Sequence, residues 1–358
     1  MFLIDAHLDM AINGVEWNRD YRQPVAAIRA DEYGMTDKPD RARGTVSLPE
    51  LRRGHIGLVV ATQLARVSAD ASLPGAGFRT PEIAWAVTQA QKAWYDAMVD
   101  FGEMVQITDA AQLKQHLALW MDTTVANETK PVGFILSLEG ADSLVNLSYL
   151  DKAYAYGLRA LGPAHYMHGR YAPGTGLTGG LTTMGKDLLR EMDALNMILD
   201  VTHLTDEGFA EAMHLYKGPV WASHHNCRTL VPRQRQLADD QIKQLIERGA
   251  VIGGCMDAWM LHPAFVQRKS DPVALGVKIE TVVNHFDHIC QIAGNSLHCA
   301  IGSDLDGTYG TEHGPMDLDT IADLQLLEGI LHRRGYTPED IENIFYKNWL
   351  RFLEKAWN

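Results

Sequence analysis

Apolar runs with the length of buried strands recur along the chain, and a segment with helical spacing follows most of them. The run His55 to Ala65 (HIGLVVATQLA) is continuous and rich in β-branched residues, which is typical of a strand covered on both faces. Strands are predicted at Phe2 to Asp9, His55 to Ala65, Gly133 to Glu139, Leu158 to His165, Met197 to His203, Val220 to His224, Ala250 to Met256 and His298 to Asp304. This alternation predicts an α/β fold with a parallel sheet.

The segments between these runs predict helices that cover the sheet. The clearest is Pro81 to Asp100, because Thr80 is a suitable N-cap and proline suits the first helical position. Others are predicted at about Leu48 to Arg53, Asp109 to Thr123, Ser148 to Tyr156, Thr183 to Leu195, Asp206 to Leu215, Ala238 to Arg248, Val277 to Ala293, Leu318 to Arg334 and Pro338 to Lys355. About eight strands, most followed by a helix, favour a single (β/α)8 TIM barrel over residues 1–358; a doubly wound open sheet is the alternative.

One long polar stretch interrupts the pattern directly after the first strand. Residues from about 13 to 45 are rich in charge, glycine and proline and show no sustained periodicity. A loop of this length in a compact domain is usually functional or partly disordered. Because it follows His7 and Asp9, we expect it to form a lid or a wall of the functional pocket.

Composition narrows the class of protein. The chain has 46% hydrophobic and 22% charged residues, as in an ordinary globular protein with a large core. Its formal net charge of −13 argues against nucleic acid or an anionic membrane as a partner. The N-terminal run is interrupted by charged residues and no later stretch resembles a membrane span, so we expect a cytoplasmic protein. Its four cysteines have no Cys-x-x-Cys spacing, which favours buried free thiols.

Side chains of metal-ligand type stand at the C-terminal ends of most predicted strands. They are His7 and Asp9, Glu139, His165, His203, His224 and Asp304. A single histidine in such a place is more often a hydrogen-bonded rim residue than a ligand. In a barrel, however, these strand ends meet at one mouth, and burying so many ionisable groups unpaired is costly. A divalent metal would compensate that cost.

The ligand types indicate which metal. Imidazoles and carboxylates without cysteine suit Zn²⁺, or Mn²⁺, Fe²⁺ or Co²⁺, and disfavour Ca²⁺ and Mg²⁺. Three histidines and two carboxylates are too many for one open catalytic zinc, but they suit two ions that share a bridging carboxylate and a bridging hydroxide. We therefore expect a binuclear Zn²⁺ site that activates water, with a nearby carboxylate to move protons.

Six motifs, in order, resemble the membrane (renal) dipeptidase family, peptidase family M19 of the amidohydrolase superfamily. They are DAHLDM (5–10), TVSLPELRRGHIG (45–57), SLEG (137–140), GGLTTMGKDLLREMDALNMILDVTHL (179–204), ASHHNCR (222–228) and GSDLDG (302–307). Together they cover nearly the whole chain. The resemblance implies a binuclear zinc dipeptidase whose substrate is a small dipeptide, often with a D-residue at its C-terminal position, and a homodimer.

The resemblance also implies roles for particular residues. One zinc would be held by His7, Asp9 and Glu139, and the other by Glu139, His203 and His224. Asp304 would carry the proton from the bridging hydroxide to the leaving amine, and His165 would polarise the substrate carbonyl or stabilise the oxyanion. The substrate carboxylate would bind an arginine, for which Arg235 is the best match, with Arg233 and Arg228 as alternatives.

The chain departs from the family at the strand predicted to end at Met256. Family members commonly end it in Asn-Phe-Tyr, whose tyrosine lines the substrate site, whereas this chain has Gly254, Cys255 and Met256. We therefore expect Met256 to line the site without supplying a hydroxyl. That departure keeps a second function open, hydrolysis of another small amide or ester such as an N-acyl amino acid. A non-catalytic metal-binding barrel is a third.

Overall fold

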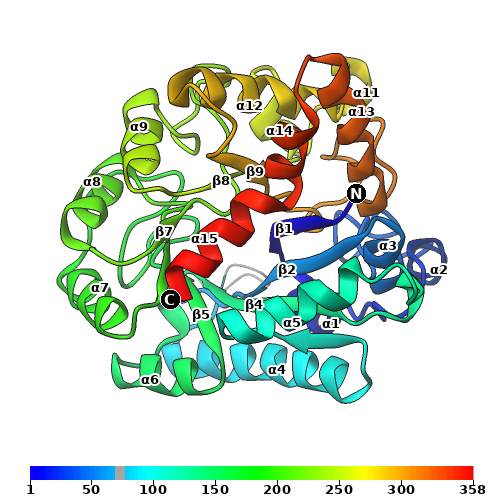
Figure 1. Cartoon of the computed structure of the whole chain (residues 1–358). Coiled ribbons are helices and arrows are strands. Elements are labelled where there is room, and N and C mark those ends of the chain that lie inside the picture. The colour runs from blue at the N-terminus through cyan, green and yellow to red at the C-terminus, as the bar shows by residue number, and fades with distance from the viewer. Residues whose placement is uncertain (69–76, 358) are drawn as a thin grey trace.

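The computed structural model describes residues 1–68 and 77–357, and its parallel strands curl into a barrel (Figure 1). Hydrogen-bonded neighbours follow the order β1-β2-β4-β5-β6-β7, while β8 pairs with β9. These strands are β1 (Leu3–Leu8), β2 (Ile56–Gln63), β4 (Val132–Glu139), β5 (Leu158–Gly162), β6 (Ile198–Asp200), β7 (Val220–Trp221), β8 (Ile252–Gly254) and β9 (Cys299–Ile301). The (β/α)8-type barrel predicted from the sequence is therefore confirmed, and the open sheet is not.

Two contacts join the separate sheets into a ring. A bridge between Ala222 and Ile252 links the end of β7 to β8. The backbone N–H of Asp304 donates to the carbonyl of His7, 3.2 Å away, which links the segment after β9 to β1. Because β1, β2 and β4 are buried at every position, their sequences are mainly apolar instead of alternating, with polar residues such as Asp5, His7 and Glu139 as exceptions.

Helices surround the barrel, as Figure 1 shows. They include α4 (Pro81–Asp100), α5 (Ala110–Met121), α6 (Ser148–Ala155), α7 (Thr183–Ala194), α8 (Asp206–Leu215), α9 (Asp239–Glu247), α12 (Glu280–Ala293) and α13 (Leu326–Arg333). The Thr80 side chain accepts a hydrogen bond from the N–H of Ile83, so α4 begins as its sequence predicts. None of the helices within residues 1–68 and 77–357 has the length and apolar character needed to cross a membrane.

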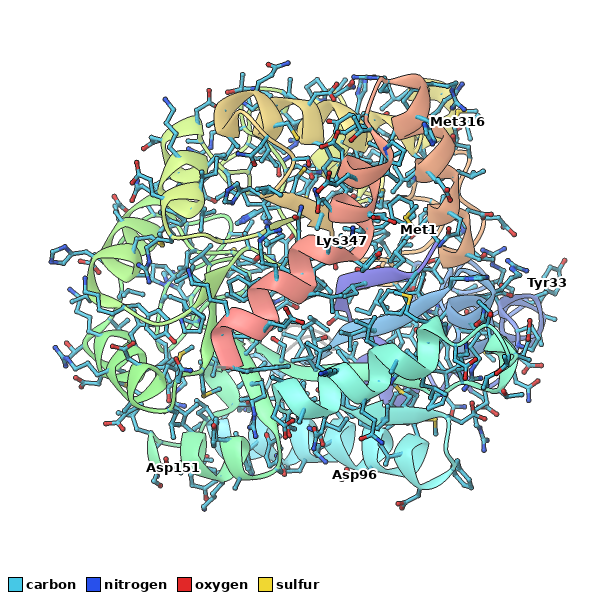
Figure 2. All side chains as sticks on the ribbon, viewed as in Figure 1. Met1, Tyr33, Asp96, Asp151, Met316 and Lys347 are labelled. Carbon is cyan, nitrogen blue, oxygen red and sulfur yellow. The ribbon has the colours of Figure 1, made fainter. Side chains whose placement is uncertain are left out.

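Helix α15 (Asn348–Trp357) lies across the end of the barrel at which the strands begin (Figure 1). It contacts segments just before two strands: Asn196, before β6, donates to the carbonyl of Ala356, and Arg351 donates to the carbonyl of Leu297, before β9. Charged side chains such as Asp96 and Asp151 lie at the outer edge of the molecule (Figure 2). With this end closed, the other end, where the strands finish, is where a substrate can enter.

Several short elements escaped prediction from the sequence. They are α1 (Met10–Glu16), α2 (Val25–Asp31), β3 (Met104–Gln106), α10 (Ala258–Leu261) and α11 (Pro272–Leu275). The predicted helix from Leu318 is a 3-10 helix (Ile321–Gln325) followed by α13, and the predicted helix from Pro338 is α14 (Pro338–Glu342), a π-helical turn (Asn343–Lys347) and α15. Helix α3 (Leu48–Arg53) was predicted correctly.

The stretch from about residue 13 to 45 is not the plain loop that its sequence indicated, and its role as a lid or a pocket wall stays a prediction. This stretch contains part of α1 and all of α2, and beside buried apolar side chains such as Val25 and Ile28 it holds several buried ion pairs. Arg19, only 3% exposed, donates to Glu32 Oε1 at 2.8 Å and to Asp40 Oδ2 at 2.9 Å. Polar residues that pair with one another leave no hydrophobic periodicity to detect, which is why the sequence resembled a loop.

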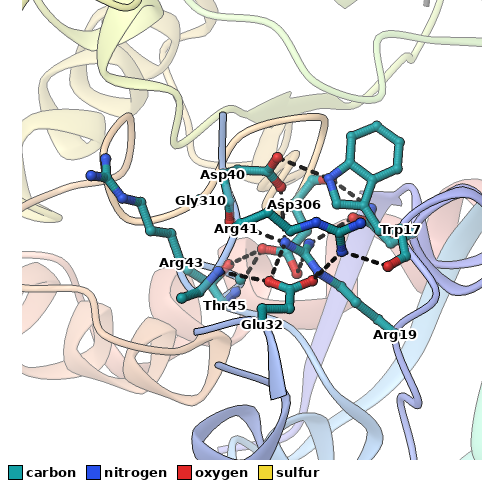
Figure 3. Close-up of polar contacts among 12 residues, drawn as sticks. Trp17, Arg19, Glu32, Asp40, Arg41, Arg43, Thr45, Asp306 and Gly310 are labelled. Atoms are coloured by element: carbon teal, nitrogen blue, oxygen red, sulfur yellow. Dashed lines mark hydrogen bonds and ion pairs between the residues drawn. The ribbon is translucent and has the colours of Figure 1, made fainter. Parts of the chain in front are cut away.

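The same ion pairs reach the segment after β9 (Figure 3). Asp306 Oδ1 accepts hydrogen bonds from the N–H and the hydroxyl of Thr45, and its Oδ2 accepts from the N–H of Val46 and the hydroxyl of Tyr21. We call Arg19, Glu32, Asp40, Tyr21, Thr45 and Asp306 the Asp306 cluster. It fastens the stretch after β1 to the residues that immediately follow Asp304.

A tight contact between β7, β8 and β9 gives a first prediction. A Cβ added at Gly302 would lie 1.8 Å from the carbonyl oxygen of Ser223, a backbone atom that cannot move aside alone. We expect Gly302→Ala to lower the free energy of unfolding by about 3 kcal/mol, the upper end for an overpacked core. The control is Gly329→Ala in α13, where the nearest atom is Arg333 Nη1 at 3.5 Å and alanine favours the helix. Equal urea midpoints for the two variants would contradict this packing argument.

Candidate functional site

Three histidines meet one carboxylate oxygen at the open end of the barrel. Glu139, the last residue of β4, places Oε1 3.1 Å from His203 Nε2, 3.4 Å from His224 Nε2 and 3.5 Å from His7 Nε2. His7 lies in β1, while His203 and His224 follow β6 and β7. Parallel strands bring these residues together because their C-terminal ends share one mouth.

The structure brings Asp9 to the same place. Its Oδ1 lies 3.8 Å from His7 Nε2 and accepts a hydrogen bond from the hydroxyl of Thr62, next to it in β2. Two compact sets of metal-type ligands result, His7 with Asp9 and Glu139, and Glu139 with His203 and His224, and the two sets share Glu139. A third set, His7, His224 and Asp304, overlaps both.

The chemistry of these atoms fits a bound cation. Glu139 Oε1 and His7 Nε2 are buried without a hydrogen-bond partner, and His203 Nε2 lies 3.2 Å from His224 Nε2. Buried polar atoms without partners are rare in proteins and need a compensating group. Nitrogen and carboxylate ligands, with no thiol among these sets, suit Zn²⁺ or a similar divalent transition metal.

Hydroxyl groups lie within hydrogen-bonding distance of the Nδ1 atoms of the three histidines. The hydroxyl of Thr175 lies 2.9 Å from His203 Nδ1, and that of Ser223 lies 2.9 Å from His224 Nδ1 and 3.5 Å from His7 Nδ1. These contacts fix the ring orientations and turn all three Nε2 atoms toward Glu139. Such partners around a metal ligand set the tautomer and support metal binding.

Burial and neighbouring charges set the protonation of the cluster. Burial lowers the pKa values of His203 and His224 well below the usual range, and neighbouring positive charge, including that of Arg235, adds to the effect. Both imidazoles are therefore neutral, which is the form that binds metals. Burial opposes ionisation of Glu139, but the charge of the neighbouring His7 holds the pKa of Glu139 well below its usual value.

Asp304 stands beside this cluster on a strained backbone. It follows β9 with φ of 60°, and its Oδ1 lies 3.9 Å from His7 Nε2. The thiol of Cys255 donates to its Oδ2 at 3.7 Å. Burial raises the pKa of Asp304 well above its usual value, so this carboxyl group can hold a proton.

His165 lies on the other side of Glu139. Its Nε2 is 3.8 Å from Glu139 Oε2, and its ring makes edge contacts with the rings of Tyr166 and His203. Burial lowers the pKa of His165, which favours the neutral imidazole. A neutral imidazole N–H can donate a hydrogen bond to a carbonyl oxygen or an oxyanion.

The three candidate arginines differ in how their donors are used. Arg228 forms an ion pair with Asp206 at 2.6 Å, and Arg233 donates to the carbonyls of Trp259, Pro263 and Phe265. Arg235, 3% exposed, donates from Nη2 to the carbonyl of His224, while its Nε and Nη1 are buried without partners. Arg235 alone of the three therefore keeps buried donors near the histidines.

A cavity of about 230 Å³ opens above these residues. Its lining comprises Asp9, Leu64, Glu139, His165, Tyr166, His203, His224, Asp257, Gln267, Arg268, Asp304, Gly307, Thr308, Tyr309 and His313. Two predicted substrate-binding residues, Met256 and Arg235, are not among these residues; Met256 is fully buried, and its neighbour Asp257 reaches the cavity instead. The chain turns after β8, so the side chain that faces the cavity comes one residue later.

Sequence reasoning missed Asp257, Arg268 and Tyr309 as cavity residues. None of them belongs to a predicted strand end, and Arg268 comes from a segment with no predicted element. Of these three, Tyr309 could have been found from the sequence, because it stands five residues after Asp304 in the same turn-rich segment. Loops after barrel strands form the walls of such sites, and a tyrosine there can supply a hydroxyl.

Solved structures share this fold over the whole chain. The chain is 22% identical to a metallopeptidase from Rhodobacter sphaeroides bound to a phosphinate mimic of the dipeptide L-Ala-D-Ala, with a TM-score of 0.77 and coverage of 100% of this chain and 99% of the other. It is 18% identical to the probable dipeptidase PvdM from Pseudomonas aeruginosa, with a TM-score of 0.78 and coverage of 100% and 96%.

Sequence comparisons identify the family. A curated relative, an uncharacterized protein in the pqqA 5′ region of Klebsiella pneumoniae, is 31% identical over 245 residues, which are 66% of this chain and 86% of that protein. Dipeptidase aclJ of Aspergillus oryzae is 24% identical over 98% of this chain and 77% of its own length. The family model for membrane dipeptidases matches residues 1–358. The chain therefore belongs to peptidase family M19, the membrane dipeptidases, and is a dipeptidase of the metallopeptidase type.

Proposed function

We propose that this protein hydrolyses the peptide bond of small dipeptides at a centre of two zinc ions, and that it accepts a D-residue at the C-terminal position. The observation that carries the proposal is Glu139 Oε1, a buried oxygen within 3.5 Å of three imidazole nitrogens and without a hydrogen-bond partner. A carboxylate in that position is suited to bridge two cations. The cavity of about 230 Å³ suits a substrate of dipeptide size.

In this proposal each ion has its own ligand set. His7, Asp9 and Glu139 would hold one zinc, and Glu139, His203 and His224 the other. Asp304 is left out of both sets: its Oδ1 lies 3.9 Å from His7 Nε2 and its Oδ2 accepts a hydrogen bond from the Cys255 thiol, and its carboxylate is assigned to proton transfer instead. When bound, the two ions would activate a water molecule and polarise the substrate carbonyl.

The residues around the ions divide the remaining tasks. Asp304 takes the proton that water loses as its oxygen bonds to the carbonyl carbon, and it gives a proton to the nitrogen as the C–N bond breaks. His165, which lies near the other oxygen of Glu139, donates a hydrogen bond to the oxyanion. Arg235 offers Nε and Nη1 to the substrate's terminal carboxylate.

Metal removal tests this function. We expect protein treated with a chelator to lose turnover of L-L and L-D dipeptides, and two equivalents of Zn²⁺ per chain to restore it. N-acetylated dipeptides and N-acyl amino acids serve as matched controls, and metal content is measured in parallel.

Three results would contradict the proposal. Cleavage of only the N-acylated compounds would move the protein to the amidohydrolase alternative. Full turnover with one bound ion would exclude the binuclear centre. Protein that binds no metal and cleaves nothing would favour a non-catalytic barrel.

A further inference from the structure

Part of the cavity lining has no role in the proposed reaction. It consists of Asp257, Gln267, Arg268, Thr308, Tyr309 and His313, from the segments that follow β8 and β9. We call these residues the distal wall. Because these residues have no role in the proposed reaction, they are available to contact a substrate side chain.

Arg268 is the cation of the distal wall. Its side chain is exposed at the cavity, and within residues 1–68 and 77–357 its guanidinium makes no hydrogen bond or ion pair. Its backbone is held firmly, since its N–H donates to His313 Nε2 at 3.0 Å and its φ is 60°. Because the backbone is fixed, the guanidinium stays at the cavity, where it can bind an anion.

Tyr309 gives an independent sign of a missing polar partner. Only 6% of it is exposed, it lines the cavity, and its hydroxyl is buried without a hydrogen-bond partner. Its ring stacks on His313 with centroids 5.9 Å apart, so the ring position is set by packing. A buried tyrosine hydroxyl normally finds a partner, and here the cavity is the place from which one can come.

The carboxylate of the distal wall is already engaged. Asp257 accepts a hydrogen bond from the N–H of Trp259 at 2.9 Å, and its Oδ1 lies 3.8 Å from His313 Nδ1. Burial raises the pKa of Asp257 to about 7, which weakens its negative charge at neutral pH. Among the described residues of this wall, the guanidinium of Arg268 is the one full positive charge without a partner, and together with the Tyr309 hydroxyl it favours an anionic partner over a cationic one.

We propose that the distal wall is a subsite for the side-chain carboxylate of an aspartate or glutamate at the C-terminal position of the dipeptide. This inference rests on the proposed function, in which Asp304 protonates the leaving amine and Arg235 holds the main-chain carboxylate. Asp304 lines the same cavity as Arg268 and Tyr309, so the leaving residue extends toward the distal wall. Its two carboxylates would then each meet an arginine.

Matched substrates test the subsite. Wild-type protein is expected to cleave L-Ala-Glu faster than L-Ala-Gln, which has the same shape without the charge, by about 10- to 100-fold in kcat/KM. The same comparison is made with whichever stereoisomer of the C-terminal residue is cleaved faster. The Glu to Gln ratio within one variant cancels any general change in activity.

Two variants locate the effect. Arg268→Gln is expected to abolish most of the Glu to Gln preference, and Tyr309→Phe to reduce it by a smaller factor. Lys269→Gln removes the neighbouring exposed charge, which does not line the cavity, and should leave the ratio unchanged.

Each other outcome is decisive. An unchanged ratio in Arg268→Gln, or equal rates on L-Ala-Glu and L-Ala-Gln in the wild type, would overturn the subsite. Faster cleavage of L-Ala-Lys would also overturn it and assign the wall to Asp257. No cleavage of any dipeptide by zinc-loaded protein would instead overturn the proposed function, which keeps the two failures distinct.

Discussion

Replacing Asp304 with asparagine is expected to lower kcat by about 10²- to 10⁴-fold, the range for loss of a positioned general acid or base. Asparagine has nearly the same shape but cannot take a proton from water or give one to an amine. Burial raises the pKa of Asp304, which strengthens this carboxylate as a proton acceptor, and the thiol of Cys255 orients its Oδ2. The variant should bind as much zinc as the wild type, because Asp304 is outside both proposed ligand sets.

Metal content decides between two roles for Asp304. It also belongs to a third compact set with His7 and His224, so a direct ligand role is the rival explanation. If Asp304→Asn lost an ion together with activity, the proton-transfer role would be wrong. Asp319→Asn, which removes an exposed carboxylate paired with Arg29, is the control for a change of charge alone and should keep both readouts.

The metal cluster could be predicted because strand geometry determines it. His7, Glu139, His203 and His224 each stand at or just after the end of a buried strand, and parallel strands bring those ends together. Side chains two residues apart in a strand point to the same side, so His7 in β1 and Asp9 just after it were expected to project together. Their positions could be predicted without knowing the paths of the loops, and the structure brings all of them together in one cluster.

The cavity walls could not be predicted in the same way. Once a strand ends, the two-residue period stops, so the side chain that faces the cavity was Asp257 and not Met256. Tyr309 and Arg268 enter from loops whose path depends on tertiary contacts, such as the hydrogen bond from Arg268 to His313. The homodimer and the cytoplasmic location stay predictions, because contacts within one chain do not determine them.

The stretch after β1 escaped prediction for a different reason. Its stability comes from buried ion pairs such as Arg19 with Glu32, and from hydrogen bonds to Asp306, which is 261 residues from Thr45. Charged residues in a sequence normally indicate solvent exposure. Only the fold shows that these charges meet one another in the interior.

Asp306 is expected to support both stability and catalysis, because it joins that stretch to the segment carrying Asp304. Its two oxygens accept four hydrogen bonds, from Thr45, Val46 and Tyr21. Asparagine would offer one acceptor oxygen and turn an NH2 group toward donors. Since each buried donor left without a partner costs about 1–3 kcal/mol, Asp306→Asn should lower the free energy of unfolding by about 3 kcal/mol or more.

The effect should extend to turnover, since the turn after β9 is strained. Asp304, Asp306 and Thr308 all have φ near 60°, a conformation that non-glycine residues keep only when surrounding contacts hold it. Urea unfolding and kcat are measured beside Asp319→Asn, whose exposed ion pair contributes about 0–1 kcal/mol. If Asp306→Asn were as stable as that control, the Asp306 cluster would not hold the turn. If it were destabilised but kept its kcat, the cluster would stabilise the fold without positioning Asp304.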